Sequence, residues 1–220
     1  MAPIIATTVE KALLRVAHRL HEVQRRHAGS HYVSGLMTAC AAAVEILATI
    51  AKSTFEELSA DDTSTLSVGA TTLSRDPTSV PHVTTWLRLC ANEGPSCRDG
   101  LTRPFLRFLV QVPKEYIDEL LPLLDRRLDS PISGFLEDAE VLNKEQALVL
   151  DIYAHWSVLM LLVEEESWWI GNLPTVTLDG LLNRYGDDFV DRFWPVRDGE
   201  KGGWWPAAML RISKEFKGWQ

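Results

Sequence analysis

The feature that most constrains the fold is an apolar stretch from Ala147 to Val163, which only Asp151, His155 and Ser157 interrupt. A helix that is apolar on every side is normally surrounded by other helices. The stretch is shorter than the roughly 20 residues that a bilayer requires, and it contains an acid and a histidine, which a membrane span disfavours. The sequence therefore predicts a central buried helix.

The N-terminal part of the chain predicts two long helices. The first has a single apolar stripe, made by residues three and four apart: Val9, Leu13, Val16, Leu20 and Val23. We expect this helix to begin near Thr7 or Thr8, and Thr7 would form a capping box with Glu10. The second helix spans about Tyr32 to Leu58 and is rich in small side chains, which allow neighbouring helices to approach closely.

Proline and asparagine positions predict where the later helices begin and end. One segment covers Lys114–Leu128, with a kink or an interruption at Pro122. Asn143 is expected to cap the central helix. A loop through Pro174 follows that helix, and the last helix opens at Trp204 with a proline in its first turn.

No convincing β-type alternation of apolar and polar residues and no internal repeat occurs in the chain. We therefore predict an all-α fold, a single-domain helical bundle over residues 1–220, because this length suits one well-packed domain. Residues 59–81 are rich in Ser, Thr, Asp, Gly and Pro, which predicts a long flexible loop. Such a loop is either a functional flap or a tolerated insertion.

The composition narrows the classes of partner. The net charge of −8 repels phosphate backbones, so we expect no direct binding to nucleic acid. The cysteines, Cys40, Cys90 and Cys97, are odd in number and sparse, which does not suit a disulfide framework, and no signal peptide is evident. We expect an intracellular, cytoplasmic protein without membrane attachment, which would enter the nucleus only with a partner.

Neither a metal site nor a cofactor site is predicted. Four histidines lie near the N-terminus, at His18, His21, His27 and His31, but their spacing matches no recognised ligand set. Solvated histidines on a polar face are the simpler interpretation. The chain also lacks a glycine-rich phosphate loop, a dinucleotide fingerprint and a metalloprotease motif, so we expect no metal and no cofactor.

Asp151 and His155 are the candidates for catalysis. They are four residues apart, so both project from one face of the central helix. The carboxylate could orient the imidazole and stabilise its charged form, as in acid–base dyads, with Tyr153 as a second hydrogen-bond donor. The alternative is structural, because polar pairs inside a bundle must also satisfy one another.

Four large side chains near the dyad are candidates to bind an apolar ligand: Trp156, Met160, Trp168 and Trp169. They could form the walls of an apolar cavity, or they could simply pack in the core. Glu45 stands alone on the apolar face of the second predicted helix. Its carboxylate either finds a partner, turns to water or lines the pocket.

The C-terminal third of the chain resembles the regulatory region of fungal zinc-cluster transcription factors. The resemblance rests on four segments: Tyr153-Ala-His-Trp156, Leu159 to Val163, Trp168-Trp-Ile-Gly171 and Trp204-Trp-Pro-Ala-Ala-Met-Leu210. It implies an all-α domain that senses small molecules or packs against protein partners. The six-cysteine zinc cluster with which that family binds DNA does not occur in this sequence, so the resemblance implies the helical pocket domain alone.

Two functions agree with these features. The first is an enzyme of fungal secondary metabolism, a cofactor-independent cyclase or isomerase that bends an apolar polyketide or terpenoid intermediate into a reactive shape. His155 and Tyr153 would donate hydrogen bonds, and Asp151 would hold His155. The second is a non-catalytic regulator that senses a ligand, or binds a helical partner or another copy of itself. The enzyme is preferred, because the resemblance retains the pocket and lacks the DNA-binding part.

Overall fold

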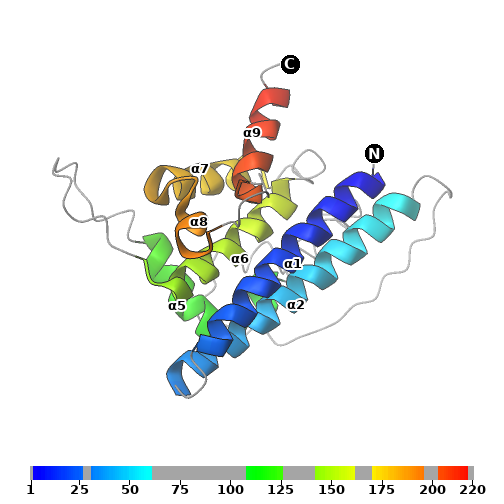
Figure 1. Cartoon of the computed structure of the whole chain (residues 1–220). Helices are drawn as coiled ribbons and strands as arrows, with labels where there is room; N and C mark the ends of the chain where they lie inside the picture. The colour runs from blue at the N-terminus through cyan, green and yellow to red at the C-terminus, as the bar shows by residue number, and fades with distance from the viewer. Residues whose placement is uncertain are drawn as a thin grey trace, which may run out of the picture.

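The computed structural model describes residues 2–26, 31–60, 108–125, 142–161, 170–195 and 203–217. Within these ranges the chain is helical and contains no strand, which confirms the predicted all-α class. The helices pack into a bundle (Figure 1). Their bounds are α1 Ala2–Arg26, α2 His31–Ala60, α5 Lys114–Asp125, α6 Lys144–Leu161, α7 Leu173–Tyr185, α8 Phe189–Phe193 and α9 Trp205–Lys217.

Helix α6 is the centre of the bundle. It contacts each of the other helices just named, and all its residues from Ala147 to Leu161 are buried except the half-buried Tyr153. Its side chains are apolar on every side, so only a position surrounded by other helices removes them all from water. The predicted central buried helix is confirmed.

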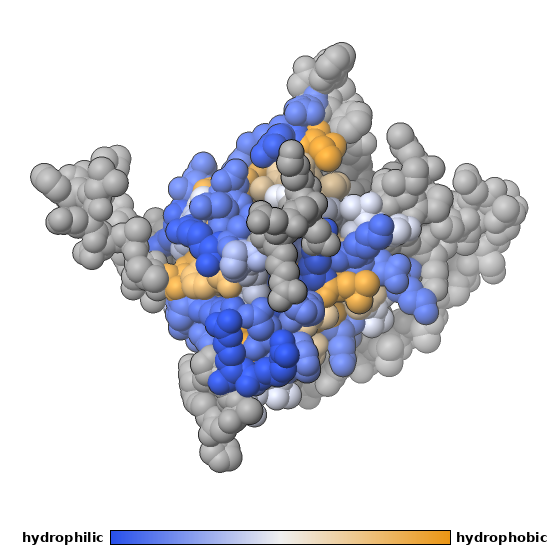
Figure 2. All heavy atoms as spheres, viewed as in Figure 1, coloured by the Kyte–Doolittle hydropathy of each residue, from blue (hydrophilic) through white to orange (hydrophobic). Residues whose placement is uncertain are grey.

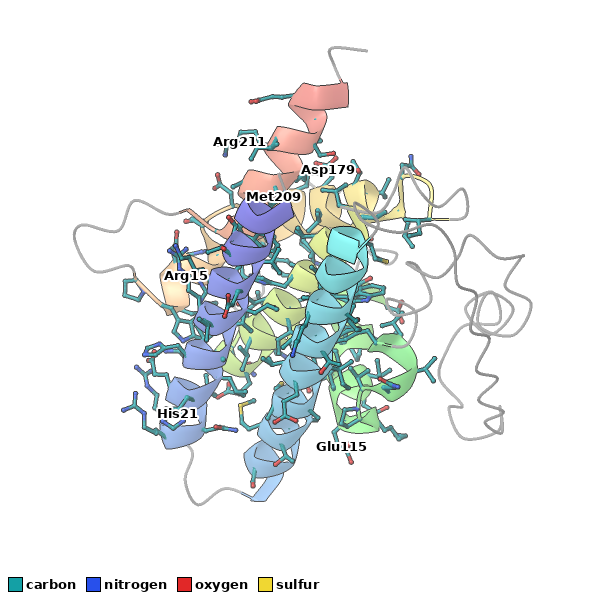
Figure 3. All side chains as sticks on the ribbon, turned by 90° about the vertical axis from the view of Figure 1, so that its right-hand side faces the viewer. Arg15, His21, Glu115, Asp179, Met209 and Arg211 are labelled. Atoms are coloured by element: carbon teal, nitrogen blue, oxygen red, sulfur yellow. The ribbon has the colours of Figure 1, made fainter. Side chains whose placement is uncertain are left out.

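Helices α1 and α2 run antiparallel beside one another across one side of the bundle (Figures 1 and 3). The five residues of the predicted apolar stripe of α1 are all buried. The predicted start of α1 is wrong, because the helix begins at Ala2 and Thr7 lies inside it. Pro3 falls in the first turn, where a missing N–H costs nothing, so the helix extends further towards the N-terminus than the capping signal indicates.

Two predictions concern proline positions. The predicted interruption at Pro122 is wrong, whereas the alternative of a kink there stays a prediction. Helix α5 continues through Pro122, which is exposed, so the helical hydrogen bond that the ring removes is lost on the solvent side of the helix. Buried Leu120 and Leu123 on either side hold the helix against the bundle. Pro174 lies in the first turn of α7 and not in a loop, because that position needs no N–H donor.

The predicted cap of α6 is confirmed. The side-chain oxygen of Asn143 accepts a hydrogen bond from the backbone N–H of Gln146 at 2.7 Å, and the Gln146 side chain accepts one from the Asn143 N–H at 3.2 Å. This reciprocal pair satisfies two N–H groups that the first helical turn leaves free. The cap sets the point at which α6 begins and therefore the depth at which Asp151 lies in the bundle.

Parts of the earlier predictions lie outside the described residues. The predicted 59–81 loop overlaps α2 at residues 59 and 60, and the remainder of it is not described. Within α2, the stretch Ser34–Ser53 is long and apolar enough to cross a membrane by length and composition, and half of it is buried in the bundle. A core helix of a soluble protein passes the same test, so this stretch is weak support for a membrane span.

Candidate functional site

The side chain of Asp151 lies at the middle of α6 and is fully buried. Its Oδ2 accepts a hydrogen bond from the Arg19 Nη1 of α1 at 2.6 Å. Its Oδ1 accepts one from the Trp204 Nε1, just before α9, at 2.7 Å. Arg19 lies 132 residues from Asp151 in sequence, and Trp204 lies 53 residues from it. One carboxylate therefore joins three distant parts of the chain.

His155 lies one turn further along α6 and is 2% exposed. Its Nδ1 is 2.8 Å from the backbone oxygen of Asp151 and 3.3 Å from the carboxylate Oδ1 of the same residue. Both atoms only accept hydrogen bonds, so Nδ1 carries the proton and donates it to them. The ring stacks on Trp205, with centroids 5.3 Å apart and planes inclined by 26°. The hydrogen bonds of Nδ1 and the stacking on Trp205 thus fix the orientation of the imidazole.

The Asp151 carboxylate is held in its ionised form. Burial by itself raises the pKa of this group, because the charged form loses its hydration. The positive charge of Arg19, the interaction with His155 and the hydrogen bonds from His155 and Trp204 outweigh burial, and the pKa of Asp151 lies well below its ordinary value of 3.8. A buried charge is tolerated only when it is paired and hydrogen-bonded in this way.

The chemistry available to the dyad follows from these distances. The carboxylate is 2.6 Å from Arg19 and 3.3 Å from His155, so its charge is balanced first by the guanidinium. In an acid–base dyad the carboxylate stabilises the imidazolium that forms when the histidine accepts a proton. Here the closest charge to that carboxylate is the guanidinium of Arg19, so its main ionic partner is not the histidine.

A second group of side chains continues the cluster from Arg19 towards α8. The guanidinium of Arg19 lies 5.8 Å from the centre of the Trp194 ring, and the Lys144 Nζ lies 4.9 Å from it, so two cations contact one indole. Lys144 also pairs with Glu22 of α1 at 2.9 Å. These contacts connect α1, the start of α6 and the end of α8 around the same arginine.

The predicted ligand-binding residues on α6 lie in the core. Trp156 and Met160 are 2% and 1% exposed. Trp156 stacks on Phe108 at 5.5 Å and contacts the Tyr153 ring at 5.4 Å. Both positions are those of packed core side chains, and the predicted role in a cavity wall stays a prediction.

Tyr153 is half-buried and faces α7. Burial raises the pKa of its phenol to about 12, although a hydrogen bond with Thr177 acts in the opposite direction. The phenol is therefore protonated and can donate a hydrogen bond at neutral pH. Its ring lies against Trp156, whereas the ring of His155 lies against Trp205, so the two predicted donors have different aromatic neighbours.

The remaining predicted residues are not part of this cluster. Glu45 is exposed on α2, which agrees with the alternative in which its carboxylate turns to water, and its role in a ligand pocket stays a prediction. His18 and His21 are exposed on α1, as solvated histidines would be. Trp168 and Trp169 lie outside the described residues.

Arg19 belongs to the site although no motif in the sequence marks it. Arg19 lies three residues after Val16 and four before Val23, both in the buried stripe of α1. The chain has one acid inside its central helix, and Arg19 is a cation at the border of a buried stripe. This combination is the signal that could have paired Arg19 with Asp151.

No protein-family model, curated protein or solved structure matches the chain, so the family resemblance stays a prediction.

Proposed function

We propose that this chain is a non-catalytic helical binding module that acts through a protein partner, and that the Asp151 cluster holds its helices together. The observation that carries the proposal is the pairing of the carboxylate. Both of its oxygens accept hydrogen bonds, at 2.6 Å from Arg19 and 2.7 Å from Trp204, and the closest contact is with a cation of another helix. A fully buried, fully paired carboxylate is typical of a structural connection between helices.

The outer surface supports a role in binding. Four large apolar side chains are 40% to 62% exposed, and they lie on α1, before α5, on α7 and on α9: Leu14, Val110, Val176 and Ile212. Isolated exposed apolar residues are common, but each is also a place where a partner can remove apolar surface from water. A rigid bundle that presents such residues is suited to helix-against-helix recognition.

The experiment that tests this proposal replaces His155 by asparagine. The amide nitrogen of Asn can occupy the place of Nδ1 and still donate to Asp151, but Asn cannot exchange a proton as imidazole does. The gene is deleted in the source organism, and the deletion is complemented with the wild-type protein or with His155→Asn. Transcripts of neighbouring genes and extracted metabolites are then measured together.

A binding module predicts that His155→Asn restores the wild-type phenotype when the two proteins are equally abundant. The preferred interpretation from sequence, a cofactor-independent cyclase or isomerase, predicts the reverse. In that case one intermediate accumulates in the deletion strain, transcripts are unchanged, and folded His155→Asn protein fails to remove the intermediate. That second result would overturn the proposal in favour of the enzyme.

A further inference from the structure

Helix α1 has a second stripe on the side opposite its buried one. The stripe consists of residues at alternating spacings of three and four, all exposed: Lys11, Leu14, His18, His21 and Arg25. Arg15 and Arg26 are exposed next to it. Figure 3 shows Arg15 and His21 on the side of α1 that points away from α2. We call these seven residues the outer stripe.

The charge of α1 is opposite to that of the rest of the chain. Five of the 22 Lys and Arg residues and two of the 30 acids lie in α1. The helix therefore carries a charge of +3, and the rest of the chain carries −11. Arg19 and Arg26 pair with Asp151 and Glu22, whereas Lys11, Arg15 and Arg25 have no ionic partner among the described residues.

The outer stripe contains one large apolar side chain, Leu14, between Lys11 and His18. Leu14 is 62% exposed, the highest value among the exposed large apolar side chains of the described helices. Figure 2 shows an apolar patch over the middle of α1 and hydrophilic side chains gathered over its C-terminal half. From Lys11 to Arg25 the stripe is about 21 Å long at 1.5 Å per residue, which is the length of roughly four helical turns.

We propose that the outer stripe of α1 is the docking surface for an acidic amphipathic helix of a protein partner. The acidic residues of that helix would pair with Lys11, Arg15 and Arg25, and one large apolar side chain would cover Leu14. Complementary charges of this kind direct the encounter and set the register of the two helices. This inference rests on the proposed function, because it names the class of partner that the module binds.

Two other occupants fit the surface less well. A second copy of this chain, related by a two-fold axis, would place the outer stripe against itself and bring like charges together. A nucleic acid would be attracted by the cations of α1, but the charge of −11 on the rest of the chain repels phosphates, and Leu14 would remain exposed to water. An acidic helix satisfies both the charges and the leucine.

The test uses the full chain and a fluorescein-labelled helical peptide of about 18 residues, long enough for the stripe. The peptide carries glutamates three and four residues apart around a single leucine, and binding is followed by fluorescence anisotropy. We expect Leu14→Asp and Arg15→Glu to weaken binding by about tenfold or more each, because each places an acid against the acidic peptide. Added salt should weaken binding to the wild-type chain.

The matched controls are Ile212→Asp and Arg211→Glu on α9, an exposed apolar residue and an exposed arginine outside the outer stripe. They introduce the same changes of charge, and we expect them to alter binding by less than about twofold. The proposal would be contradicted if the α9 variants lost as much affinity for the peptide as the α1 variants. It would also be overturned by tighter binding to a DNA duplex than to the peptide, or by self-association that the Leu14→Asp change abolishes.

The docking surface and the proposed function fail in different ways. If the peptide does not bind but His155→Asn still complements the deletion, the docking surface is wrong and the binding-module proposal stands. If an intermediate accumulates in the deletion strain and folded, equally abundant His155→Asn protein fails to remove it, the proposed function is wrong whatever the peptide does. Both proposals are supported if the peptide binds the wild-type chain, if Leu14→Asp loses peptide binding and complementation of the deletion, and if His155→Asn and the α9 controls keep them.

Discussion

The substitution Asp151→Asn tests the structural role of the buried cluster most directly. Arg19 and Trp204 donate hydrogen bonds to different oxygens of the Asp151 carboxylate, at 2.6 Å and 2.7 Å. An amide of the same shape has one accepting oxygen and one donating nitrogen, so at least one neighbour would meet a donor. The side chain of Arg19 is 14% exposed, and its charge would remain largely buried without the carboxylate that pairs with it at 2.6 Å.

The expected loss is large. Removal of one partner from a buried ion pair costs about 3–5 kcal/mol, because the other charge stays buried and unpaired. For a chain of this size that corresponds to a decrease of about 6–20 °C in the midpoint of thermal unfolding. A loss of this size is a considerable part of the roughly 5–15 kcal/mol by which domains are stable. Urea unfolding at pH 7, followed by tryptophan fluorescence and circular dichroism, measures it.

Asp179→Asn is the matched control. Asp179 on α7 pairs with Lys214 of α9 at the same distance of 2.6 Å, but the two side chains are 34% and 52% exposed. An exposed pair contributes only about 0–1 kcal/mol. If Asp151→Asn and Asp179→Asn lose similar free energies of unfolding, the Asp151 cluster does not hold the helices together and the reasoning is refuted.

The pH dependence provides a second measurement of the same effect. The pKa of Asp151 is lower in the folded protein than its ordinary value of 3.8, so its contribution to stability is fully present above that pH. The contribution is lost progressively as the pH falls below 3.8, towards the lower pKa of the folded state. The difference in unfolding free energy between the wild type and Asp151→Asn should therefore be constant near neutral pH and shrink in acid.

Three further substitutions have defined outcomes. Tyr116→Phe removes the hydrogen bond from the buried phenol to the Val149 oxygen at 3.0 Å and should cost about 0.5–1.5 kcal/mol in urea unfolding, with no loss if that bond is unimportant. Asp191→Asn should raise the midpoint of thermal unfolding at pH 7. Burial and the nearby Asp188 and Asp187 raise the pKa of Asp191, although Arg19 lowers it, so the charge of Asp191 is unfavourable in the folded state. Burial, with a smaller effect of Glu119, raises the pKa of the Cys40 thiol to about 12. In a protein that also carries Cys90→Ser and Cys97→Ser, a thiol reagent should therefore label Cys40 only as fast as the bundle opens. Rapid labelling of the folded protein would contradict this burial.

Much of the fold could be predicted from local patterns. The stripe of α1, the cap at Asn143, the unbroken apolar character of α6 and the start of α9 at Trp204 and Trp205 are all properties of a few neighbouring residues. Periodicity and capping act over one or two turns of helix, so they can be read without knowing what lies beside the helix. The predictions were wrong at Thr7, because α1 begins at Ala2, and at Pro174, which lies in the first turn of α7 and not in a loop. The interruption expected at Pro122 does not occur either, because α5 continues through it.

The candidate site depended on tertiary packing. The sequence determined that Asp151 and His155 share one face of a buried helix, because a spacing of four in a helix requires it. It did not determine that Arg19 and Trp204 would reach the same carboxylate, since they lie 132 and 53 residues away and approach it only through the packing of α1 and the start of α9 against α6. Which cation neutralises a buried acid depends on how helices pack across the whole chain, so the tertiary structure alone decided that Arg19 pairs with Asp151.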